Sequence, residues 1–217
     1  MKQFTIIGLG RFGLALATNL VSLGHNVIGI DSNQKIVDKC ADLMTLVVNC
    51  DATDKGCLAE LNIQESDAVI VSIGSDIQAS LLTIFALKEL NTPTIWVKSN
   101  SKEHHTIVSK LGVSKIIHPE EDIAQHVSIS LNYPMIEDFI SMGDGVYSVS
   151  IKIKEKFNHV KISDLITKHF NEIHPLLVKR NEEIFAPVSP DFVLHFGDTF
   201  LLTAEHEKLI AIANLFS

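Results

Sequence analysis

The stretch Ile7-Gly8-Leu9-Gly10-Arg11-Phe12-Gly13 follows an apolar β-type run, residues 4–7, and opens a helical pattern. In such a turn Gly8 permits a sharp reversal, Gly10 lets a phosphate approach the backbone, and Gly13 lets the helix pack against the strand. The helix that begins there offers unpaired N–H groups and a partial positive charge to an anion. The stretch therefore predicts a strand–turn–helix unit that binds a nucleotide, although an ordinary strand–helix connection can have the same glycines.

A carboxylate stands where a nucleotide-binding unit of this kind places its ribose ligand. Asp31 ends the next apolar run, residues 26–30, about 20 residues after the glycines, which is the spacing of a ribose-binding acid. A negative charge here disfavours a ribose 2′-phosphate, so NADP is not expected. The strand, the helix and Asp31 together predict nucleotide binding in this part of the chain.

The first part of the chain alternates short β-rich runs with helical patterns. The expected strands are residues 4–7, 26–30, 45–48, 68–73, 94–97 and 114–117. The helical patterns include a segment with Leu14, Ala17, Leu20 and Val21 on one face, residues 77–90, and a helix that begins at Pro119. Residues 68–73 contain no charged side chain and are apolar except for Ser72, as in a strand buried on both faces of a parallel sheet. The alternation predicts an α/β fold with a doubly wound, Rossmann-like parallel sheet.

The alternation of strand and helix patterns ends near Pro134. Residues 146–153 alternate, with Tyr147, Val149, Ile151 and Ile153 on one face, which predicts a half-exposed antiparallel strand. Further strands are expected near residues 176–178, 184–186 and 200–202, with helices at 163–169 and 205–216. We therefore expect two domains: a Rossmann-like nucleotide-binding domain at residues 1–134, and a small α+β ligand or dimerisation domain at residues 135–217.

The composition fits a folded protein with a substantial core. The 217 residues are 46% hydrophobic and 20% charged, with a formal net charge of −8. These values exclude a disordered chain, a collagen-like repeat and a small disulfide scaffold. The acidic balance also argues against a nucleic-acid partner, which requires a basic surface.

The cysteines and the apolar segments indicate a soluble, cytoplasmic protein. Cys40, Cys50 and Cys57 are odd in number and form no Cys-x-x-Cys pair, so we expect reduced thiols rather than a disulfide or a metal site. Residues 12–30 have no formally charged side chain, but polar residues and a turn at Gly24 divide them into a helix and a strand. We therefore expect no membrane span.

Polar residues follow three other expected strands. These segments are Asp51-Ala52-Thr53, Ile73-Gly74-Ser75 and Lys98-Ser99-Asn100, with His104 in the next helix. Open α/β sheets bind ligands at the carboxyl ends of their strands, so the segments are candidates to line the nucleotide site. Asp51, Ser75 and Asp76 have an alternative role as helix caps, which is the better-supported interpretation for any one of them.

Arg11 and Glu120 each have two interpretations. Arg11 has no obligatory part in a dinucleotide motif, and it is either a solvated surface charge or a bidentate ligand of a terminal phosphate. Glu120 follows Pro119 at a helix start, where the helix dipole favours an acid. A carboxylate at this edge of the sheet can also hold a divalent cation against phosphates. The residues alone leave Arg11 open and favour the dipole role for Glu120.

The sequence has no recognisable catalytic set. Tyr133 and Tyr147, the only tyrosines, lack the Lys four residues later that short-chain dehydrogenases use, and there is no Cys/His/Asp constellation. We therefore expect no catalytic residue and a binding protein rather than an enzyme. The alternatives are a small NAD-dependent oxidoreductase, which the glycines and Asp31 would also suit, and a structural Rossmann scaffold that binds no nucleotide.

Several motifs, together with the glycine turn, are those of a known family. They are Val71-Ser72-Ile73-Gly74, Asp76-Ile77-Gln78-Ala79-Ser80, Leu87-Lys88-Glu89-Leu90, Ile95-Trp96-Val97-Lys98 and Ile116-Ile117-His118-Pro119-Glu120. With these motifs the chain resembles the RCK (also called KTN) family, the cytosolic regulators of potassium channels and transporters. Within that family it is most similar to the gating subunits of Ktr-type potassium uptake systems. The resemblance covers the whole chain and is more specific in the first domain.

The resemblance implies a site for ATP and ADP rather than for NAD. It implies that Arg11 meets the γ-phosphate across a subunit interface, that Glu120 contacts the divalent cation (Mg²⁺ or Ca²⁺) bound with ATP, and that Asp31 holds the ribose. The remaining implied site residues are Gly8, Gly10, Phe12, Gly13, Asp51, Ala52, Ile73, Gly74, Ser75, Lys98, Ser99, Asn100 and His104.

The resemblance also implies partners. Proteins of this family form dimers that assemble into octameric rings, and the rings dock on a membrane potassium channel subunit. The chain would then be cytoplasmic and peripherally associated with the cell membrane. ATP and ADP would act by favouring different ring shapes, because only a difference in affinity between two states can shift their equilibrium.

The second domain of this family often binds cyclic di-AMP, which inhibits uptake. Ile162, Ile173 and Pro187 match the apolar positions that contact this ligand. The family's Arg-Ala-Lys-Tyr-Gly segment reads Ile-Thr-Lys-His-Phe-Asn here, at residues 166–171, without an Arg. For Ile162 and Ile173 the alternative is a place in the apolar core.

Overall fold

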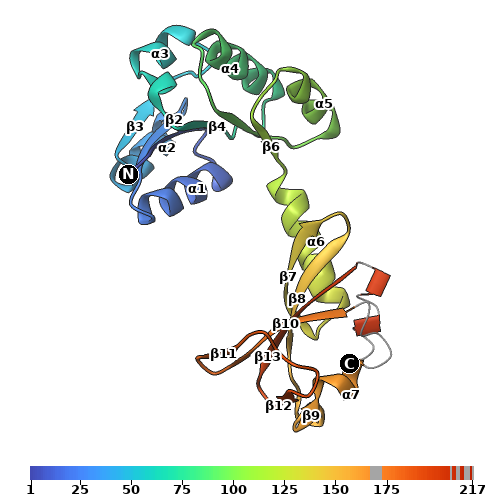
Figure 1. Ribbon diagram of the computed structural model, residues 1–217. Coiled ribbons are helices and arrows are strands. Elements are labelled where there is room, and N and C mark those ends of the chain that lie inside the picture. Colours follow the sequence, from blue (N-terminus) through green and yellow to red (C-terminus); the bar gives the residue numbers. More distant parts are fainter. Residues whose placement is uncertain (167–172, 206, 209–210, 213–215, 217) are drawn as a thin grey trace. The chain divides into compact units, whose positions relative to one another are not determined.

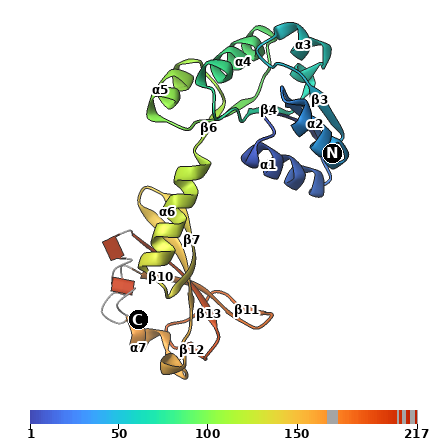
Figure 2. The same ribbon diagram turned by 180° about the vertical axis from the view of Figure 1, so that it is seen from behind.

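The chain divides into two units, Met1–Asp122 and Ile123–Ser217, each with its own internal contacts (Figures 1 and 2). The structure is a computed structural model, which describes all residues except 167–172, 206, 209–210, 213–215 and 217. The division falls inside helix α6 (Pro119–Asn132), earlier than the expected end of the first domain at residue 134. The reason is that the second half of α6 packs on the second unit, where Ile129 is part of the core.

Over the described residues, the first unit contains a parallel sheet of six strands in the order β3-β2-β1-β4-β5-β6. The strands are β1 (Gln3–Ile7), β2 (Asn26–Asp31), β3 (Leu46–Asn49), β4 (Ala68–Val71), β5 (Ile95–Lys98) and β6 (Lys115–Ile117). The chain runs outward from β1 to β3 and then returns to place β4 on the other side of β1, as in a doubly wound sheet. The predicted α/β class is therefore confirmed.

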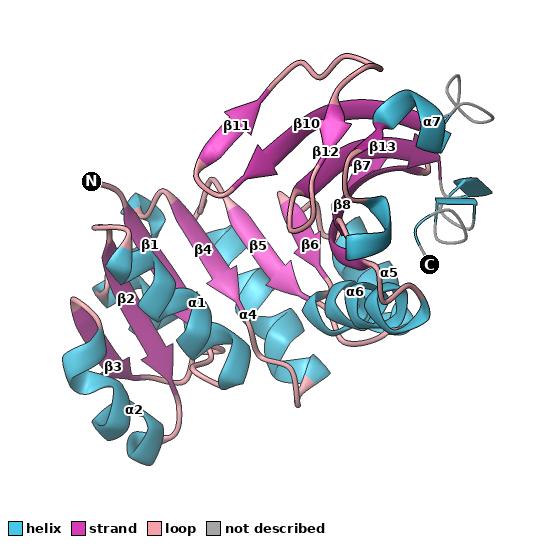
Figure 3. Cartoon of the chain, turned by 90° about the horizontal axis from the view of Figure 1, so that it is seen from below, coloured by secondary structure: helices cyan, strands magenta, loops and turns pink. Residues whose placement is uncertain are grey.

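Helices flank this sheet, and apolar strands lie between them (Figure 3). They are α1 (Arg11–Ser22), α2 (Gln34–Cys40), α3 (Lys55–Glu60), α4 (Ile77–Glu89) and α5 (Lys102–Lys110), with short 3₁₀ turns at Ala41–Leu43 and Ile63–Glu65. All four residues of β4 are buried, as the apolar run predicts. Within the described residues, no helix combines the length and the apolarity needed to cross a bilayer.

The described part of the second unit is mainly antiparallel, with the strand order β11-β10-β13-β8-β7. Its strands are β7 (Ile136–Gly143), β8 (Val146–Lys152), β10 (Ile173–Arg180), β11 (Glu183–Phe185) and β13 (Thr199–Glu205), with β9 (Val160–Lys161) paired to β12 (Val193–Leu194). Helix α7 (Ile162–Ile166) and a 3₁₀ turn at Glu155–Phe157 complete these elements. The expected face of β8 is buried, since Val149 and Ile151 are fully inaccessible and Tyr147 is 9% exposed.

The sequence patterns missed some elements and left others only partly tested. Strand β7 falls at the expected domain boundary, where acidic residues interrupt the alternation of apolar side chains. The expected helix at residues 205–216 and the segment at residues 166–171 lie in part outside the described residues.

The cysteine prediction was wrong. Cys50 and Cys57 form a disulfide, and within the described part of the chain Cys40 is a free, buried thiol. Cys50 directly follows β3, and Cys57 lies in the first half of α3. The turn between them brings their Cα atoms to 6.4 Å, within the range that a disulfide requires. Cysteine spacing alone does not reveal such a turn.

In the second unit, an ion pair joins Arg180, which is partly exposed, to the buried Asp198. The Nε and Nη2 atoms of Arg180 donate to the two carboxylate oxygens of Asp198, both at 2.8 Å, and the backbone N–H of His195 donates to the same carboxylate. The Arg180 guanidinium also lies 5.5 Å from the ring centres of Phe185 and Phe192. Burial acts to raise the pKa of Asp198, but the hydrogen bonds from Arg180 and His195 outweigh it, so the pKa lies below its ordinary value.

This pair predicts an acid-sensitive second unit. A carboxyl whose pKa is lowered by folding contributes stability above its unfolded pKa of about 4, and that contribution is lost as the pH falls through the folded value. Asp198→Asn should lower the free energy of unfolding at pH 7 by about 2 kcal/mol, because Arg180 loses its charged partner. The variant should also show a smaller decrease in the free energy of unfolding between pH 7 and pH 3 than the wild-type protein. Urea unfolding at pH 7 and pH 3, followed by NMR signals of the second unit, measures both effects.

Asp191→Asn is the matched control. Asp191 pairs with Lys161 at 2.9 Å, but its side chain is 80% exposed, and solvent-exposed ion pairs contribute little to the free energy of unfolding. Equal losses in the two variants would show that the Arg180–Asp198 pair does not stabilise the unit.

Candidate functional site: the ligand edge of the parallel sheet

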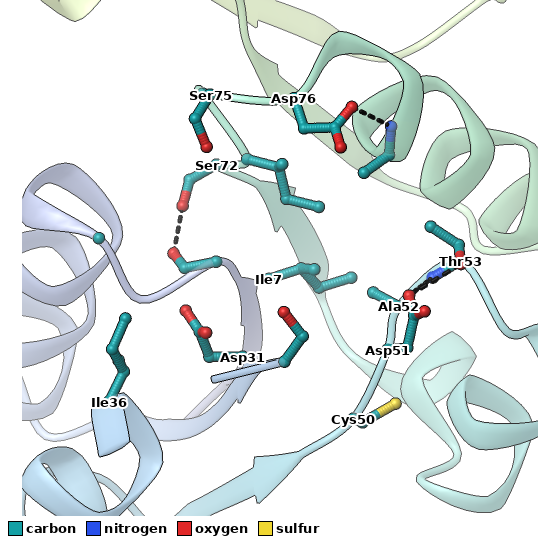
Figure 4. A pocket seen from close by; sticks show the side chains of 16 residues that line it. Ile7, Asp31, Ile36, Cys50, Asp51, Ala52, Thr53, Ser72, Ser75 and Asp76 are labelled. Carbon is teal, nitrogen blue, oxygen red and sulfur yellow. Dashed lines mark hydrogen bonds between the residues drawn. The ribbon is translucent and has the colours of Figure 1, made fainter. Parts of the chain in front are cut away.

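A cavity of about 410 Å³ lies at the carboxyl ends of the first four strands. Its wall comes from the turn after β1, the end of β2 and the segments after β3 and β4 (Figure 4). The lining residues are Ile7, Gly8, Gly10, Asp31, Ser32, Ile36, Cys50, Asp51, Ala52, Thr53, Ser72, Ile73, Gly74, Ser75, Asp76 and Ala79. We call this space the first cavity. It includes the point where the strand order reverses, between β1 and β4.

The glycine turn is held tightly on its inner side and is open on its outer side. Gly8 has φ +91° and donates its N–H to the Ile30 carbonyl at 2.8 Å, while Ser72 Oγ donates to the Gly8 carbonyl at 2.5 Å. A Cβ on Gly13 would lie 2.0 Å from the Gly8 oxygen, whereas a Cβ on Gly10 would meet nothing within 4 Å. The turn therefore has space at Gly10 for a ligand to approach the backbone and the start of α1.

Asp31 ties this turn to the second strand. One carboxylate oxygen accepts the Leu9 N–H and the other accepts the Asn33 N–H, both at 2.8 Å. The side chain also lines the first cavity. Because a carboxylate has about four lone-pair positions, these two bonds leave capacity for hydroxyl donors of a ligand.

Of Asp51, Ser75 and Asp76, the three residues with an alternative role as helix caps, only Asp76 caps a helix. Asp76 caps α4, since its side chain accepts the Ala79 N–H at 2.9 Å, so Ser75 is not the cap of that helix. Asp51 is not a cap either, because Asp54 caps α3. Asp51 instead accepts from the N–H and the hydroxyl of Thr53, at 3.0 and 2.8 Å, and these bonds lower the pKa of its carboxyl.

A second group of predicted residues lies beyond β5 and β6. Ser99, Asn100 and Glu120, with His118 and Glu121, line a cavity of about 230 Å³, which we call the second cavity. Lys98 is 8% exposed, and its Nζ donates to Glu120 at 2.5 Å. That hydrogen bond is the main reason that the pKa of Glu120 is lowered, and the positive charges of Lys98 and Arg11 lower it further.

Two contacts link the second group to the glycine turn and the first cavity. The Asn100 side-chain amide donates to the Gly74 carbonyl, so a residue of the second cavity is bonded to a residue of the first. The Lys98 ammonium lies 5.8 Å from the centre of the Phe12 ring, next to the glycine turn. An open glycine turn, the Asp31 carboxylate and the Lys98–Glu120 pair are thus gathered at one edge of the sheet.

The structure groups the predicted site residues in three ways. Eight line the first cavity: Gly8, Gly10, Asp31, Asp51, Ala52, Ile73, Gly74 and Ser75. Ser99, Asn100 and Glu120 line the second, while Arg11, Phe12, Gly13 and Lys98 contact or flank these groups. His104 is 1% exposed, its Nε2 has no hydrogen-bond partner among the described residues, and burial together with the nearby His118 lowers its pKa.

Sequence reasoning missed several cavity residues. They are Ile7, Ser32, Ile36, Cys50, Ser72, Asp76 and Ala79 in the first cavity, and His118 and Glu121 in the second. Most of them adjoin a predicted residue at a strand end, so extending each strand-end segment by one or two residues would have found them. Ile36 and Ala79 lie in helices, where no local signal indicates that they face a cavity.

The residues proposed for the second domain are not gathered in the same way. Ile162 and Ile173 are 0% and 1% exposed and belong to the core of the second unit, whereas Pro187 is exposed. The first two therefore occupy the apolar-core position that was the alternative reading.

The doubly wound sheet and its glycine turn agree with the proteins to which this chain is similar in sequence. The model of the TrkA-N domain matches residues 4–119, which is more than half of the chain. The chain belongs to the TrkA-N family. It is 34% identical over 207 residues to the Ktr system potassium uptake protein A of Bacillus subtilis, covering 95% of this chain and 93% of that protein. It is 31% identical over 201 residues to the Ktr system potassium uptake protein C of the same organism, covering 93% and 91%.

Solved structures of the TrkA-N and RCK type share the fold. The GsuK channel bound to NAD has a TM-score of 0.68 at 14% identity, covering 100% of this chain and 39% of that one. The TrkA-N domain of ybaL from Escherichia coli has a TM-score of 0.53 at 16% identity, covering 60% and 96%. The chain thus spans less than half of the channel polypeptide. The family resemblance read from the motifs is confirmed.

The glycine turn of this TrkA-N protein predicts a position that tolerates no side chain. Gly13→Ala should lower the free energy of unfolding of the first unit by about 2 kcal/mol, because the added methyl group overlaps the Gly8 carbonyl and the Ser72 hydroxyl. Urea unfolding followed by the fluorescence of Trp96, the single tryptophan, measures this loss. Gly10→Ala is the control, with a loss of about 1 kcal/mol or less because that position is open. Equal stability of the two variants would contradict the tight packing at Gly13.

Proposed function

We propose that this chain is a nucleotide-sensing regulatory subunit of a potassium uptake system, and that it catalyses no reaction. The observation that carries the proposal is the paired charge group, Lys98 with Glu120 and the nearby Arg11, beside a Rossmann-type glycine turn. The similarity to Ktr system potassium uptake proteins over more than nine-tenths of the chain supports the transport role.

The ligands in this proposal are ATP and ADP. Their phosphates would lie against Gly10 and the start of α1, where the structure leaves space, and Asp31 would bind the ribose hydroxyls. Asp51, Ala52 and the segment from Ile73 to Ser75 would surround the sugar and the base. Arg11 would meet the γ-phosphate of a nucleotide across a subunit interface.

A divalent cation would accompany ATP at Glu120. The Glu120 side chain is 65% exposed, and its lowered pKa keeps the carboxylate charged. Among the described residues, no group of three His, Cys, Asp or Glu side chains is arranged to hold a metal ion by itself. Mg²⁺ or Ca²⁺ would therefore be shared between Glu120 and phosphate oxygens, which is the usual arrangement for Mg²⁺ with nucleotides.

The proposal includes assembly and location. The chain would form dimers that assemble into an octameric ring in the cytoplasm and dock on a membrane potassium channel subunit. Leu82 and Phe85 of α4 are 47% and 59% exposed, and neighbouring apolar side chains of this size on a surface are typical of contacts with another protein. Differential affinity of ATP and ADP for two ring shapes would then regulate uptake.

Nucleotide titration of the purified full chain tests the function. We expect calorimetry to show binding of ATP and ADP, with weaker binding of NADH, since the site offers a charge group for a terminal phosphate. Turnover of NADH with any substrate would instead indicate the oxidoreductase alternative, and failure of all three nucleotides to bind would leave only a structural scaffold. Cyclic di-AMP, proposed for the second unit, is titrated in the same series.

Arg11 provides a sharper prediction within this function. Arg11→Ala should reduce the ratio of ATP to ADP affinity by about tenfold, because a charged hydrogen bond to the γ-phosphate is lost while contacts common to both nucleotides remain. Lys110→Ala, which removes an exposed charge outside both cavities, is the control and should keep the ratio. An unchanged ratio in Arg11→Ala would rule out γ-phosphate sensing by this residue.

A further inference from the structure

The Cys50–Cys57 disulfide is part of the wall of the first cavity. Cys50 lines the cavity beside Asp51 (Figure 4) and is 5% exposed, and Cys57 is partly exposed on α3. The two residues are seven positions apart, and their Cα atoms are separated by 6.4 Å. The proposed function gives no role to this cross-link.

The cross-link encloses the polar turn that faces the ligand. Asp51, Ala52 and Thr53, which all line the cavity, lie between the two cysteines. Within this ring the Asp51 carboxylate accepts from Thr53, the Asp54 N–H donates to the Asp51 carbonyl at 3.0 Å, and Asp54 caps α3. The disulfide therefore joins the end of β3 to α3 across the turn, and it restricts the conformations that this wall can adopt.

We propose that Cys50 and Cys57 form a reversible redox site that changes the nucleotide affinity of the first cavity. The inference rests on the proposed function, which supplies both the nucleotide and the cytoplasmic location. Disulfides in reducing compartments are typically transient, and they act in catalysis or in redox sensing. The sequence has no recognisable catalytic set that this disulfide could assist. Because the loop that it closes forms part of the cavity wall, a change in its redox state would change the ligand site.

The chemistry is thiol–disulfide exchange with a small-molecule thiol. The thiolate attacks Sγ of Cys57, the more accessible sulfur, and the S–S bond breaks as Cys50 leaves as a thiolate and takes up a proton. A second small thiol then attacks the mixed disulfide at the small-molecule sulfur and releases Cys57. In total the protein gains two electrons and two protons, and two small thiols are oxidised to one disulfide.

The restraint that the disulfide places on the turn predicts the direction of the effect. In the oxidised protein the turn at Asp51 to Thr53 is already restrained, so binding loses less conformational entropy and the nucleotide binds more tightly. Reduction frees the wall and weakens binding. Cys40 takes no part, because it is 2% exposed, and both burial and the charge of Asp31 raise the pKa of its thiol.

The first experiment establishes the cross-link in the full chain. The protein is equilibrated with dithiothreitol or with its cyclic disulfide, unfolded in guanidinium chloride so that the buried Cys40 can also react, alkylated with a maleimide, and its mass is measured by mass spectrometry. We expect three adducts on the reduced protein, which has three cysteines, and one adduct, on Cys40, after oxidation. Three adducts in both conditions would overturn the proposal.

The second experiment measures ADP affinity of both forms by calorimetry. We expect the oxidised form to bind ADP about fivefold more tightly than the reduced form. This is the change in affinity expected when one or two side chains no longer have to be ordered on binding. Cys57→Ser should bind with the reduced-state affinity whatever the redox buffer, and Cys57→Ala provides the same test should the first variant fold poorly. Cys40→Ala is the matched control and should retain the full redox response. Equal affinities of the oxidised and reduced wild-type protein would reject the inference.

A readout without nucleotide separates this inference from the proposed function. Hydrogen exchange of peptides covering residues 49–58 should slow on oxidation in wild-type protein and in Cys40→Ala, but not in Cys57→Ser. Absence of ADP binding in both redox states, with a clear exchange response, would contradict the proposed function and, with it, the effect on nucleotide affinity. Unchanged exchange on oxidation would contradict the redox site itself.

Discussion

The hydrogen-bond set around Gly8 fixes the part of the molecule on which the candidate site depends. Its N–H is bonded to the carbonyl of Ile30, its carbonyl accepts from Ser72, and the next residue, Leu9, donates to Asp31. Three neighbouring strands, β2, β1 and β4, are thereby joined at their carboxyl ends. Because these bonds satisfy the inner polar groups of the turn, its outer face and the start of α1 remain available to an anion.

The Lys98–Glu120 pair lies at the same edge of the sheet, beyond β5 and β6, and adds charged groups to the glycine turn. Lys98 is nearly buried and would be unfavourable without a partner, so its bond to Glu120 determines the positions of both side chains. Asn100, two residues along, bonds to Gly74 and connects the two cavities. In the proposed function this succession of groups would hold the ribose at Asp31 and the phosphates between the glycine turn and the charge pair.

The common location of the strand-end residues could be predicted from the sequence, because parallel strands place their carboxyl ends at one edge of the sheet. The capping roles were predicted less well, since Asp51, Asp54 and Asp76 are chemically equivalent in sequence and only the backbone path decides which one meets a helix. The Cys50–Cys57 pair was missed because two cysteines seven residues apart meet only when the intervening turn folds back.

By itself, the sequence determined the α/β class, the glycine turn, its acid at Asp31 and the family, because periodicity and short motifs depend on near neighbours in the chain. Only the tertiary structure decided that Glu120 pairs with Lys98, that half of α6 packs on the second unit, and that His104 is buried. These outcomes depend on contacts between residues far apart in sequence, where packing and desolvation, rather than local preference, select the partner.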